Sequence, residues 1–535
     1  MAYPTMRARR PLIMGRRGAV ASNHPVATMA GMDVLKAGGN AVDAAVAVAL
    51  TLGVVEPHMS GLGGDGFYHV FRAKDGQAAT FNGTGMAPEA ATVARYRAEG
   101  GIPNTGPLSV QTPGMVAGLA LMHAAFASRP WGALFGGAIE AARDGFAATH
   151  ALRHFIGENR QKLEPDPLSR AIFLPGGDLP GLASLVVQKA LAGFLQRLAA
   201  EGPDAFYRGA LARDLAAAMQ ARGALVGEGD LAGTRGLRGT PIAVPYRGFE
   251  VRQTPPNSMG FSMLQMMRIL ERHNLAALGW NSPELVHLMI EAKKRAFLDR
   301  EAHAGADEVP LDRLLSAERA AAHDATITDR AAVLPVRPSQ GGDTTYFCVA
   351  DGEGNVVSAI QSINGPFGSG ITAGETGVML NNRMSYWHLD EGHANRLRPG
   401  ARVRHTMNAP MVMREGRPWC AFGTPGADNQ VQVNMQVLVA MADFGLDPQQ
   451  AVEGPRWSSS QGGQESNYPH GGADVVTIER GMGEECIRGL EARGHVVKVV
   501  GDLEGPCSVE AIRILDNGVL MAASDPRRDG WAGSY

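Results

Sequence analysis

Apolar residues near the N-terminus are spaced as in two consecutive helices. The stretch VATMAGMDVLKAGG ends at Gly38–Gly39, and glycine favours the backbone conformation that closes a helix. Asn40 follows at the position of a helix N-cap, and residues 41–55 (AVDAAVAVALTLGVV) are apolar nearly all round. We therefore expect two helices, the second of them buried. This second segment contains Asp43 and is too short to span a bilayer.

The pattern changes twice further along the chain. Residues 110–300 have a largely helical pattern, and residues 301–340 are polar, Ala-rich and interrupted by prolines, as in an exposed connector. From Gly341 onward, TTYFCVA, the turn DGEGN and VVSAIQSI predict a hairpin, and further strand-like runs are PMVMR, WCAFGT, HVVKVV and VEAIRIL. A long helical section flanked by strand pairs predicts a layered α/β fold to which both halves contribute strands.

Composition narrows the class of protein. The chain has 535 residues, 45% of them hydrophobic, and its 50 basic and 53 acidic residues give a formal charge of −3. This balance gives no reason to expect a nucleic acid or an anionic membrane as partner. The four cysteines lack C-x-x-C spacing, which argues against a zinc site or a disulfide framework. Only PLIM follows Arg9–Arg10, far short of the apolar segment of a signal peptide, so we expect a cytoplasmic protein.

The stretch GLGGDG, residues 61–66, matches the glycine spacing of a dinucleotide-binding loop. That motif requires a strand before it and a helix after it. Here a helical run precedes it and the strand-like FYHVF follows, so we interpret it as a tight glycine turn packed close to another segment. No H-E-x-x-H, phosphate-binding P-loop or G-x-S-x-G motif is present in the sequence.

The sequence GGDTTYF, residues 341–347, permits two interpretations. Thr344 and Thr345 are β-branched residues of the kind that begin an ordinary strand. Alternatively, a cut before Thr344 would make it an N-terminal nucleophile. A threonine hydroxyl needs a base beside it, and a freed α-amine with a pKa near 8 is suited to that task. The physical chemistry of the residues alone leaves both interpretations open.

Six stretches, in order along the chain, match the pattern of one known family. They are VLKAGGNAVDAAVAVALTLGVVEPHMSGLGGDGF, PNSMG, IEAKKRAFLDR, GDTTYFCVADGEGNVVS, GTPGADNQ and AVEGPRW. Through them the chain resembles the γ-glutamyltransferase family of N-terminal-nucleophile hydrolases over nearly its whole length. The resemblance implies a four-layer αββα sandwich, made as one precursor that cuts itself between Asp343 and Thr344. Residues 1–343 and 344–535 would be the two subunits of one intertwined structural domain.

The resemblance also implies the catalytic residues. Thr344 would be the nucleophile both of self-cleavage and of catalysis, forming an acyl-enzyme with an amide substrate. Ser362 matches a second hydroxyl residue that supports the nucleophile in the family. Gly426 and Ala427 match the paired glycines whose backbone N–H groups hold the oxyanion, and alanine preserves that donor.

The residues that would read a γ-glutamyl group depart from the family pattern. Thr84 stands where an arginine binds the α-carboxylate, and His405–Thr406 replace paired serines. Arg383 and Tyr386 replace residues that hold the α-amine, although Asn364 matches an amine-binding asparagine. An arginine at position 383 would repel an ammonium group.

The segment between Tyr386 and His405 also bears on specificity. It is shorter than the lid loop of many family members, which favours water as acceptor and admits other acyl groups. The arginines of this segment permit two interpretations. They form a solvated basic loop, or, together with Arg383, they select an anionic acyl group such as a dicarboxylic half-amide. They are Arg396, Arg398, Arg402 and Arg404.

We therefore expect an amide hydrolase or acyltransferase of the γ-glutamyltransferase family that favours hydrolysis. The alternative is an amidohydrolase or acylase of oxamate or glutaryl-cephalosporin type, and an alternative of another class is an unprocessed, non-catalytic binding relative. The expected partners are a small-molecule amide substrate and the two subunits of the same precursor. A homodimer of the two-subunit enzyme is a further expected assembly. Neither a metal nor an organic cofactor is expected.

Overall fold

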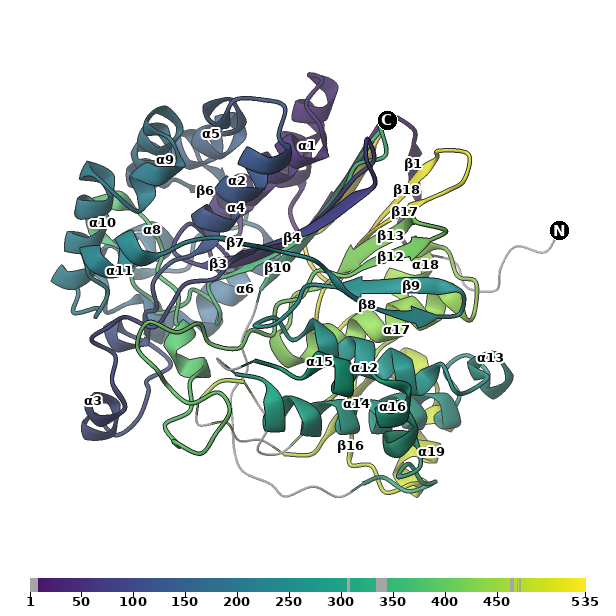
Figure 1. The fold of residues 1–535 in the computed structure, drawn as a ribbon. Helices are drawn as coiled ribbons and strands as arrows, with labels where there is room; N and C mark the ends of the chain where they lie inside the picture. The colour runs from purple at the N-terminus through teal and green to yellow at the C-terminus, as the bar shows by residue number, and fades with distance from the viewer. Residues whose placement is uncertain (1–7, 306–307, 333–343, 462–465, 469, 471–472) are drawn as a thin grey trace.

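Two seven-stranded antiparallel sheets stack against each other in the middle of the molecule (Figure 1). The computed structural model describes residues 8–305, 308–332, 344–461, 466–468, 470 and 473–535. The first sheet, called the β13 sheet, has the order β1 (Ile13–Gly15), β18 (Leu520–Ser524), β17 (Glu510–Ile514), β13 (Arg417–Gly423), β12 (Met411–Arg414), β9 (Phe249–Gln253) and β8 (Ile242–Tyr246). The second, called the β10 sheet, has the order β19 (Trp531–Ser534), β2 (Gly18–Ser22), β10 (Thr345–Asp351), β11 (Val356–Ser362), β3 (Asp65–Arg72), β4 (Gln77–Gly83) and β7 (Leu237–Gly239).

Helices cover the outer face of each sheet, so the molecule has four layers (Figure 1). The β10 sheet is covered by α1 (Pro25–Lys36), α2 (Ala41–Val55) and α4 (Met115–Phe126). Outside them, α5 (Gly136–Asp144) packs on α2, α9 (Lys189–Glu201) packs on α5, and α10 (Ala210–Ala221) packs on α9. The β13 sheet is covered by α12 (Gly260–Leu270), α14 (Pro283–His303), α17 (Gln430–Ala442), α18 (Pro448–Glu453) and α19 (Glu484–Ala492). A small sheet of β14 (Trp457–Ser459), β15 (Val476–Glu479) and β16 (Val497–Val500) lies beside α19.

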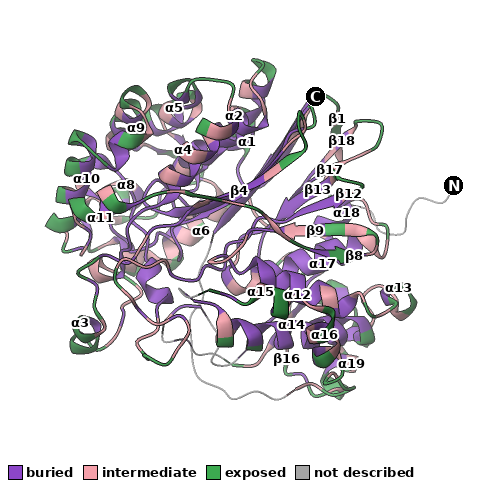
Figure 2. Cartoon of the chain, in the orientation of Figure 1, coloured by how far each residue is buried: buried purple, intermediate pink, exposed green. Residues whose placement is uncertain are grey.

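Every residue of β10 is buried, and its side chains alternate between its two faces. The strands in the middle of the molecule are mostly buried (Figure 2). Tyr346, Cys348 and Ala350 pack between the two sheets, whereas Phe347 and Val349 pack against the helices. Following the same alternation, the side chain of Thr345 faces the helices. The side chain of Thr344, one residue earlier, faces the space between the two sheets. In β11, Ile360 faces the other sheet, which puts Ser362 on the same side as Thr344.

The pairing of β10 with β11 brings two hydroxyl residues together. Thr345 lies opposite Gln361 in the antiparallel register, so the next pair outward is Thr344 and Ser362. The DGEGN sequence forms the turn that fixes this register, with Gly354 at φ +89°. The turn at the far end of the hairpin thus determines which residue of β11 faces Thr344.

Most elements expected from the sequence are confirmed. Asn40 caps α2 by accepting hydrogen bonds from the backbone of Val42 and Asp43, and every residue of α2 except Gly53 is buried. The GLGGDG segment is a turn between α2 and β3, and a Cβ atom at Gly64 would lie 2.3 Å from the carbonyl oxygen of Ser362. The expected strands correspond to β10–β13, β16 and β17.

Of the exposed connector expected over residues 301–340, the described part is mostly exposed or partly exposed as expected, but it is helical and not a plain connector. This part continues α14 and contains α15 (Leu311–Leu314) and α16 (Ala317–Asp324). Ala320 and His323 are buried, because α16 packs on α12 and α14, and His323 contacts the buried carboxylate of Asp299. Alanine-rich polar sequence with single buried positions is typical of a short amphipathic helix. The nearby prolines had led us to interpret it as a connector. Pro335 and Pro338 lie outside the described residues.

The remaining helices are short and lie at the surface of the layers. They are α3 (Val93–Ala98), α6 (His150–Glu158), α7 (Arg160–Leu163), α8 (Pro167–Phe173), α11 (Glu228–Gly233) and α13 (Leu275–Leu278), and the two-stranded ribbon is β5 (Phe146–Ala147) with β6 (Leu185–Val186). Among the described residues, none of the helices combines the length and the apolar character needed to cross a membrane.

Candidate active site

The hydroxyl of Thr344 lies at the open end of β10, between polar groups at the end of β11 and at the start of α17. It donates to Ser362 Oγ at 3.4 Å and accepts a hydrogen bond from Gln430 Nε2 at 3.3 Å. Ser362 Oγ also accepts the backbone N–H of Asn364 at 2.7 Å. Thr344 is only 2% exposed, so these contacts orient its hydroxyl in a site sheltered from water. Asp343, on the other side of the expected cut, lies outside the described residues.

Thr345 is held on the opposite face of the same strand. Its hydroxyl donates to Glu56 Oε2 at 2.6 Å and accepts from Asn23 Nδ2 at 3.1 Å. Both partners are buried, and they belong to the loops after α2 and after β2. These hydrogen bonds fix the start of β10 from the helix side, which leaves the Thr344 side chain facing Ser362.

Gly426 and Ala427 lie in the turn that leads from β13 into α17. Gly426 has φ +118°, and a Cβ atom there would lie 2.3 Å from Cys507 Sγ, so the position requires glycine. Ala427 has φ +48°, an uncommon value for a residue with a side chain that is often retained at functional sites. Gln430, the first residue of α17, is the one that contacts Thr344. The turn therefore stands at the positive end of the α17 dipole, next to the Thr344 site.

Arg383 is buried beside Asn364 and Asp65. Its Nε lies 3.3 Å from Asp65 Oδ2, and its Nη1 donates to Asn364 Oδ1 at 3.3 Å. The guanidinium carbon lies 4.6 Å from the centre of the Tyr386 ring, a cation–π distance. The remaining nitrogen, Nη2, is buried and has no hydrogen-bond partner among the described residues.

Asp65 is the residue that neutralises this arginine. It also accepts the backbone N–H of Gly85 through Oδ1 at 2.8 Å. Burial raises the pKa of Asp65, and the attraction of Arg383 opposes that rise. The pair thus carries little net charge, and a second anion near Arg383 would be attracted less strongly than by an isolated guanidinium.

Asn364 has its polar atoms occupied by protein groups. Its Nδ2 donates to Asn382 O, Ser385 Oγ and Asn467 Oδ1, at distances of 3.1, 3.0 and 2.9 Å. Its Oδ1, the atom that an ammonium group would need, accepts from Arg383. Asn364 also adopts φ +79°, which places it in a left-handed turn directly after β11.

His405 completes the cluster around Arg383. The ring is fully buried, its Nε2 lies 3.9 Å from Asp65 Oδ2, and neither ring nitrogen has a hydrogen-bond partner among the described residues. Burial, with Arg383 and Arg402 nearby, holds the pKa of His405 well below its usual range, so the ring is neutral. Buried polar atoms without partners require an explanation, and a bound polar group is one.

The other expected substrate residues surround this cluster. Tyr386 Oη and Thr406 Oγ1 hydrogen-bond to each other at 3.0 Å. Thr84 donates its hydroxyl to Asn82 Oδ1 at 2.7 Å and is contacted by Asn257 Nδ2 at 3.3 Å. Thr84 is therefore engaged with its own neighbours and provides no cation at this position.

The arginines before His405 do not act as one group. Arg404 is buried and forms an ion pair with Glu301 at 2.9 Å, which neutralises its charge, while its Nε and Nη2 have no hydrogen-bond partner among the described residues. Arg402 donates to the backbone carbonyl of Thr84 at 3.0 Å and to that of Arg235 at 2.6 Å. Arg396 and Arg398 are partly buried. Neither a freely solvated loop nor a set of four anion receptors describes this segment.

Sequence reasoning missed three residues of the site. Asp65 was assigned only to a glycine turn, although it follows Gly63–Gly64 and begins β3. Gln430 ends the family-like stretch GTPGADNQ but carried no signal of contact with Thr344, and Glu56 lies in a stretch noted only for resemblance. Each contacts a residue far away along the chain, so only the tertiary structure reveals the pairing.

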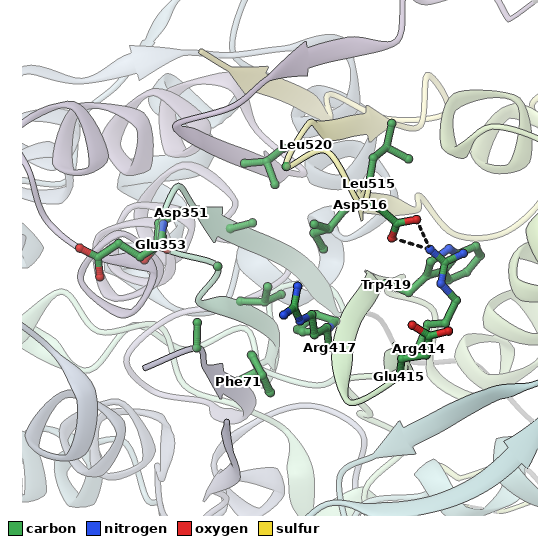
Figure 3. Close-up of a pocket in the computed structure, with 17 residues that line it drawn as sticks. Phe71, Asp351, Glu353, Arg414, Glu415, Arg417, Trp419, Leu515, Asp516 and Leu520 are labelled. Atoms are coloured by element: carbon green, nitrogen blue, oxygen red, sulfur yellow. Dashed lines mark hydrogen bonds and ion pairs between the residues drawn. The ribbon is translucent and has the colours of Figure 1, made fainter. Parts of the chain in front are cut away.

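Figure 3 shows a cavity of about 760 Å³. It is lined by the turns at the strand ends away from Thr344, including Asp351, Trp419 and Leu520, and Arg414 pairs with Asp516 at its rim. Asp351 ends β10, so the cavity is about 20 Å from Thr344 at the usual rise per strand residue. Its residues are too distant to take part in chemistry at Thr344.

A family model described as gamma-glutamyltranspeptidase matches residues 27–535. The chain belongs to the gamma-glutamyltranspeptidase family. It is 36% identical over 526 residues to the glutathione hydrolase-like YwrD proenzyme of Bacillus subtilis, covering 97% of this chain and 99% of the relative. It is 38% identical over 538 residues to the acylase ACY 1 proenzyme of Pseudomonas sp. strain SE83, covering 96% and 93%.

A solved structure extends the family assignment to the fold. The crystal structure of cephalosporin acylase from Bacillus halodurans superposes with a TM-score of 0.90 at 31% identity, covering 100% of this chain and 98% of that chain. The four-layer arrangement is thus that of a gamma-glutamyltranspeptidase-family hydrolase, as expected from the sequence. The chain is an enzyme of this hydrolase class, and its named relatives include both a glutathione hydrolase-like protein and acylases.

Proposed function

We propose that the chain is a self-processing amide hydrolase that acts through an acyl-enzyme on Thr344, with hydrolysis favoured over transfer. The observation that supports this most directly is the Thr344 hydroxyl, sheltered at the end of a buried strand between Ser362 and Gln430. A cut after Asp343 would free the α-amine of Thr344 beside its own hydroxyl. The proenzyme names of the relatives are consistent with such processing into residues 1–343 and 344–535.

In the proposed reaction, Thr344 Oγ1 attacks the amide carbonyl while the α-amine accepts the hydroxyl proton. The resulting oxyanion is held by the backbone N–H groups of Gly426 and Ala427, at the positive end of α17. The C–N bond then breaks, and the α-ammonium returns its proton to the departing amine. In the second half of the reaction, the α-amine takes a proton from water as the water oxygen attacks the ester carbonyl. The α-ammonium then gives a proton to Thr344 Oγ1 as the ester C–O bond breaks, which releases the acid and restores Thr344.

Ser362 is expected to support the nucleophile through its hydroxyl. Ser362→Ala removes the group 3.4 Å from Thr344 Oγ1 and is expected to lower kcat by about 10- to 100-fold, because a buried polar group left without its hydrogen-bond partner costs about 1–3 kcal/mol. Ser362→Thr retains the hydroxyl and should stay within a few-fold of the wild type. Steady-state kinetics on purified, folded variants distinguish the two, and equal rates for Ser362→Ala and the wild type would contradict this role.

For the acyl group, the geometry favours a carboxylate-bearing acyl chain without an α-ammonium, as in the acylase alternative. Asn364 Oδ1 is already occupied by Arg383, so an ammonium bound there would lie close to the guanidinium. Two like charges 4 Å apart near a protein surface repel by about 4 kcal/mol, a cost that Asp65 reduces in part. Arg383 Nη2 and His405 instead offer unpaired polar atoms to an anionic or neutral acyl end.

Two anilides that differ only in the α-amino group test this preference. Glutaryl-p-nitroanilide is expected to be hydrolysed with a kcat/KM at least about tenfold above that of γ-glutamyl-p-nitroanilide, equivalent to about 1.4 kcal/mol. Release of nitroaniline is measured for both, and ammonia release from dicarboxylic half-amides extends the comparison to smaller substrates. Faster turnover of the γ-glutamyl compound would restore the γ-glutamyl assignment.

A further inference from the structure

We propose that His287, Glu291 and His495 form a binding site for one divalent transition-metal ion such as Zn²⁺. Potential ligand atoms of the three side chains all lie within 4.8 Å of one another, and all three residues are buried. His287 and Glu291 are four residues apart on α14, which puts them on one face of the helix. His495 comes from the loop before β16 and reaches them from the far part of the sequence. Two imidazoles and a carboxylate are a usual ligand set for zinc.

The orientation of His287 is the one found in metal-binding histidines. Its Nε2 lies 2.8 Å from the carbonyl oxygen of Thr328, which can only accept a hydrogen bond, so Nε2 carries the proton. Nδ1 therefore presents its lone pair, and it is directed at His495 Nε2, 2.8 Å away. A ligating histidine commonly donates its other N–H to a backbone carbonyl, which fixes the ring as it is fixed here.

The two imidazole rings also face each other nitrogen to nitrogen, with the proton of His495 Nε2 between them. Their centres lie 5.1 Å apart with planes at 66°. Two nitrogens bound tetrahedrally to zinc at 2.0–2.1 Å are about 3.3 Å apart, so the pair needs to open by only about half an ångström. His495 would move its proton from Nε2 to Nδ1, and the ion would replace the hydrogen bond between the rings.

Glu291 supplies the negative charge, in competition with two cations. It pairs with Lys294 at 3.2 Å and with Arg295, and it accepts the backbone N–H of Ala332 at 3.1 Å. A carboxylate has about four lone-pair sites, so it can bind an ion and keep part of these contacts. The nearby cations weaken the site, and Asp474, 3.5 Å from Lys294, offsets one of them.

A second group of possible ligands provides an internal comparison. Glu301, His388 and His393 also lie within reach of one another. However, the rings of His388 and His393 are stacked with centres 3.5 Å apart and planes at 5°. Their lone pairs lie in parallel planes, so the two rings do not converge on one ion. The possible ligand atoms are similarly close in the two groups, but the relative orientation of the two histidine rings differs.

The proposed site would join segments on either side of Thr344. Its residues on α14 precede Thr344 and His495 follows it, so a bound ion would link the two parts of the chain. The inference does not depend on the proposed function, because it uses neither Thr344 nor its chemistry.

Metal binding to the full chain, prepared without a histidine tag and dialysed against a chelator, tests the site. We expect one equivalent of Zn²⁺ or Co²⁺ by elemental analysis, d–d absorption bands of tetrahedral Co²⁺, and a higher Tm with Zn²⁺. His495→Gln and His287→Gln should each weaken binding at least about tenfold and abolish the Tm shift. His393→Gln, in the stacked group, is the matched control and should bind like the wild type.

Each outcome bears on the proposal. Absence of a bound equivalent in the wild type, or equal binding by His495→Gln and the wild type, would overturn it. Loss of binding in His393→Gln with retention in His495→Gln would assign the metal to the stacked group instead. Should His287→Gln fail to fold, His495→Gln decides the question, because its side chain comes from a loop and circular dichroism reports its folding.

Discussion

Thr344→Ala is expected to remain a single 535-residue chain and to lose amide hydrolysis by at least about a thousandfold. Alanine removes the only atom of this side chain that can attack a carbonyl, and the proposed mechanism uses that atom both for the cut after Asp343 and for the acyl-enzyme. Loss of both properties through one oxygen atom is the specific result of an N-terminal-nucleophile mechanism. A denaturing gel followed over time and the release of nitroaniline measure the two properties separately.

Thr345→Ala is the matched control for this experiment. It removes the same atoms from the next residue, whose hydroxyl contacts Glu56 on the other face of β10. We expect it to be cut and active, with stability reduced by about 1–3 kcal/mol because Glu56 loses a buried hydrogen bond. Two subunits from Thr344→Ala would refute the nucleophile assignment. A wild-type chain that stays whole and inactive on prolonged incubation would support the non-catalytic alternative.

The sequence was sufficient for those features that depend on neighbouring residues. The alternation in TTYFCVA and the DGEGN turn predicted the hairpin, and the resulting register places Ser362 opposite Thr344. The N-cap at Asn40 and the glycine turn before Asp65 were likewise visible locally. These features follow from hydrogen-bond geometry over a few residues, where a single sequence is informative.

The charge balance of the site could not be predicted in this way. Arg383 was expected to repel an ammonium group, but Asp65, which pairs with it, lies 318 residues earlier in the chain. Arg404 was placed in a candidate anion receptor, yet it is committed to Glu301 of α14. Ionic side chains on loops carry no periodic signal, so their partners become known only when the sheets and helices bring the loops together.

The two sheets explain why the site contains residues from so many segments. Each sheet has strands from before and after Thr344, and the helices α2 and α17 begin or end near the same edge of the sandwich. Thr344 is therefore fixed by Glu56 through Thr345 on one face and by Gln430 on the other. A nucleophile on a strand buried between layers is held more rigidly than one on a loop, which suits a reaction that depends on positioning.

Arg383→Gln is expected to change which acyl group the enzyme accepts. In the proposed site, Arg383 Nη2 donates to the carboxylate of a glutaryl-type substrate, a charge-assisted hydrogen bond with a net contribution of about 1.5–3 kcal/mol. Loss of this bond should lower kcat/KM for glutaryl-p-nitroanilide by about 10- to 100-fold, mainly through KM, because the contact is remote from the reacting carbonyl. γ-Glutamyl-p-nitroanilide carries the same carboxylate and loses the same hydrogen bond, but the repulsion of its ammonium group is removed as well, so its kcat/KM should fall less than that of glutaryl-p-nitroanilide.

The single variant has a second effect that must be separated from specificity. Arg383→Gln leaves Asp65 buried without its cation, which is strongly destabilising in general and would raise the pKa of Asp65 further. Asp65→Asn combined with Arg383→Gln replaces the buried ion pair with two neutral amides of similar shape. We expect the double variant to regain stability by thermal unfolding while keeping the altered preference between the anilides. If both variants prefer the same anilide as the wild type by the same factor, Arg383 does not select the acyl group, and the preference must arise from His405, Tyr386 or Thr406 around it.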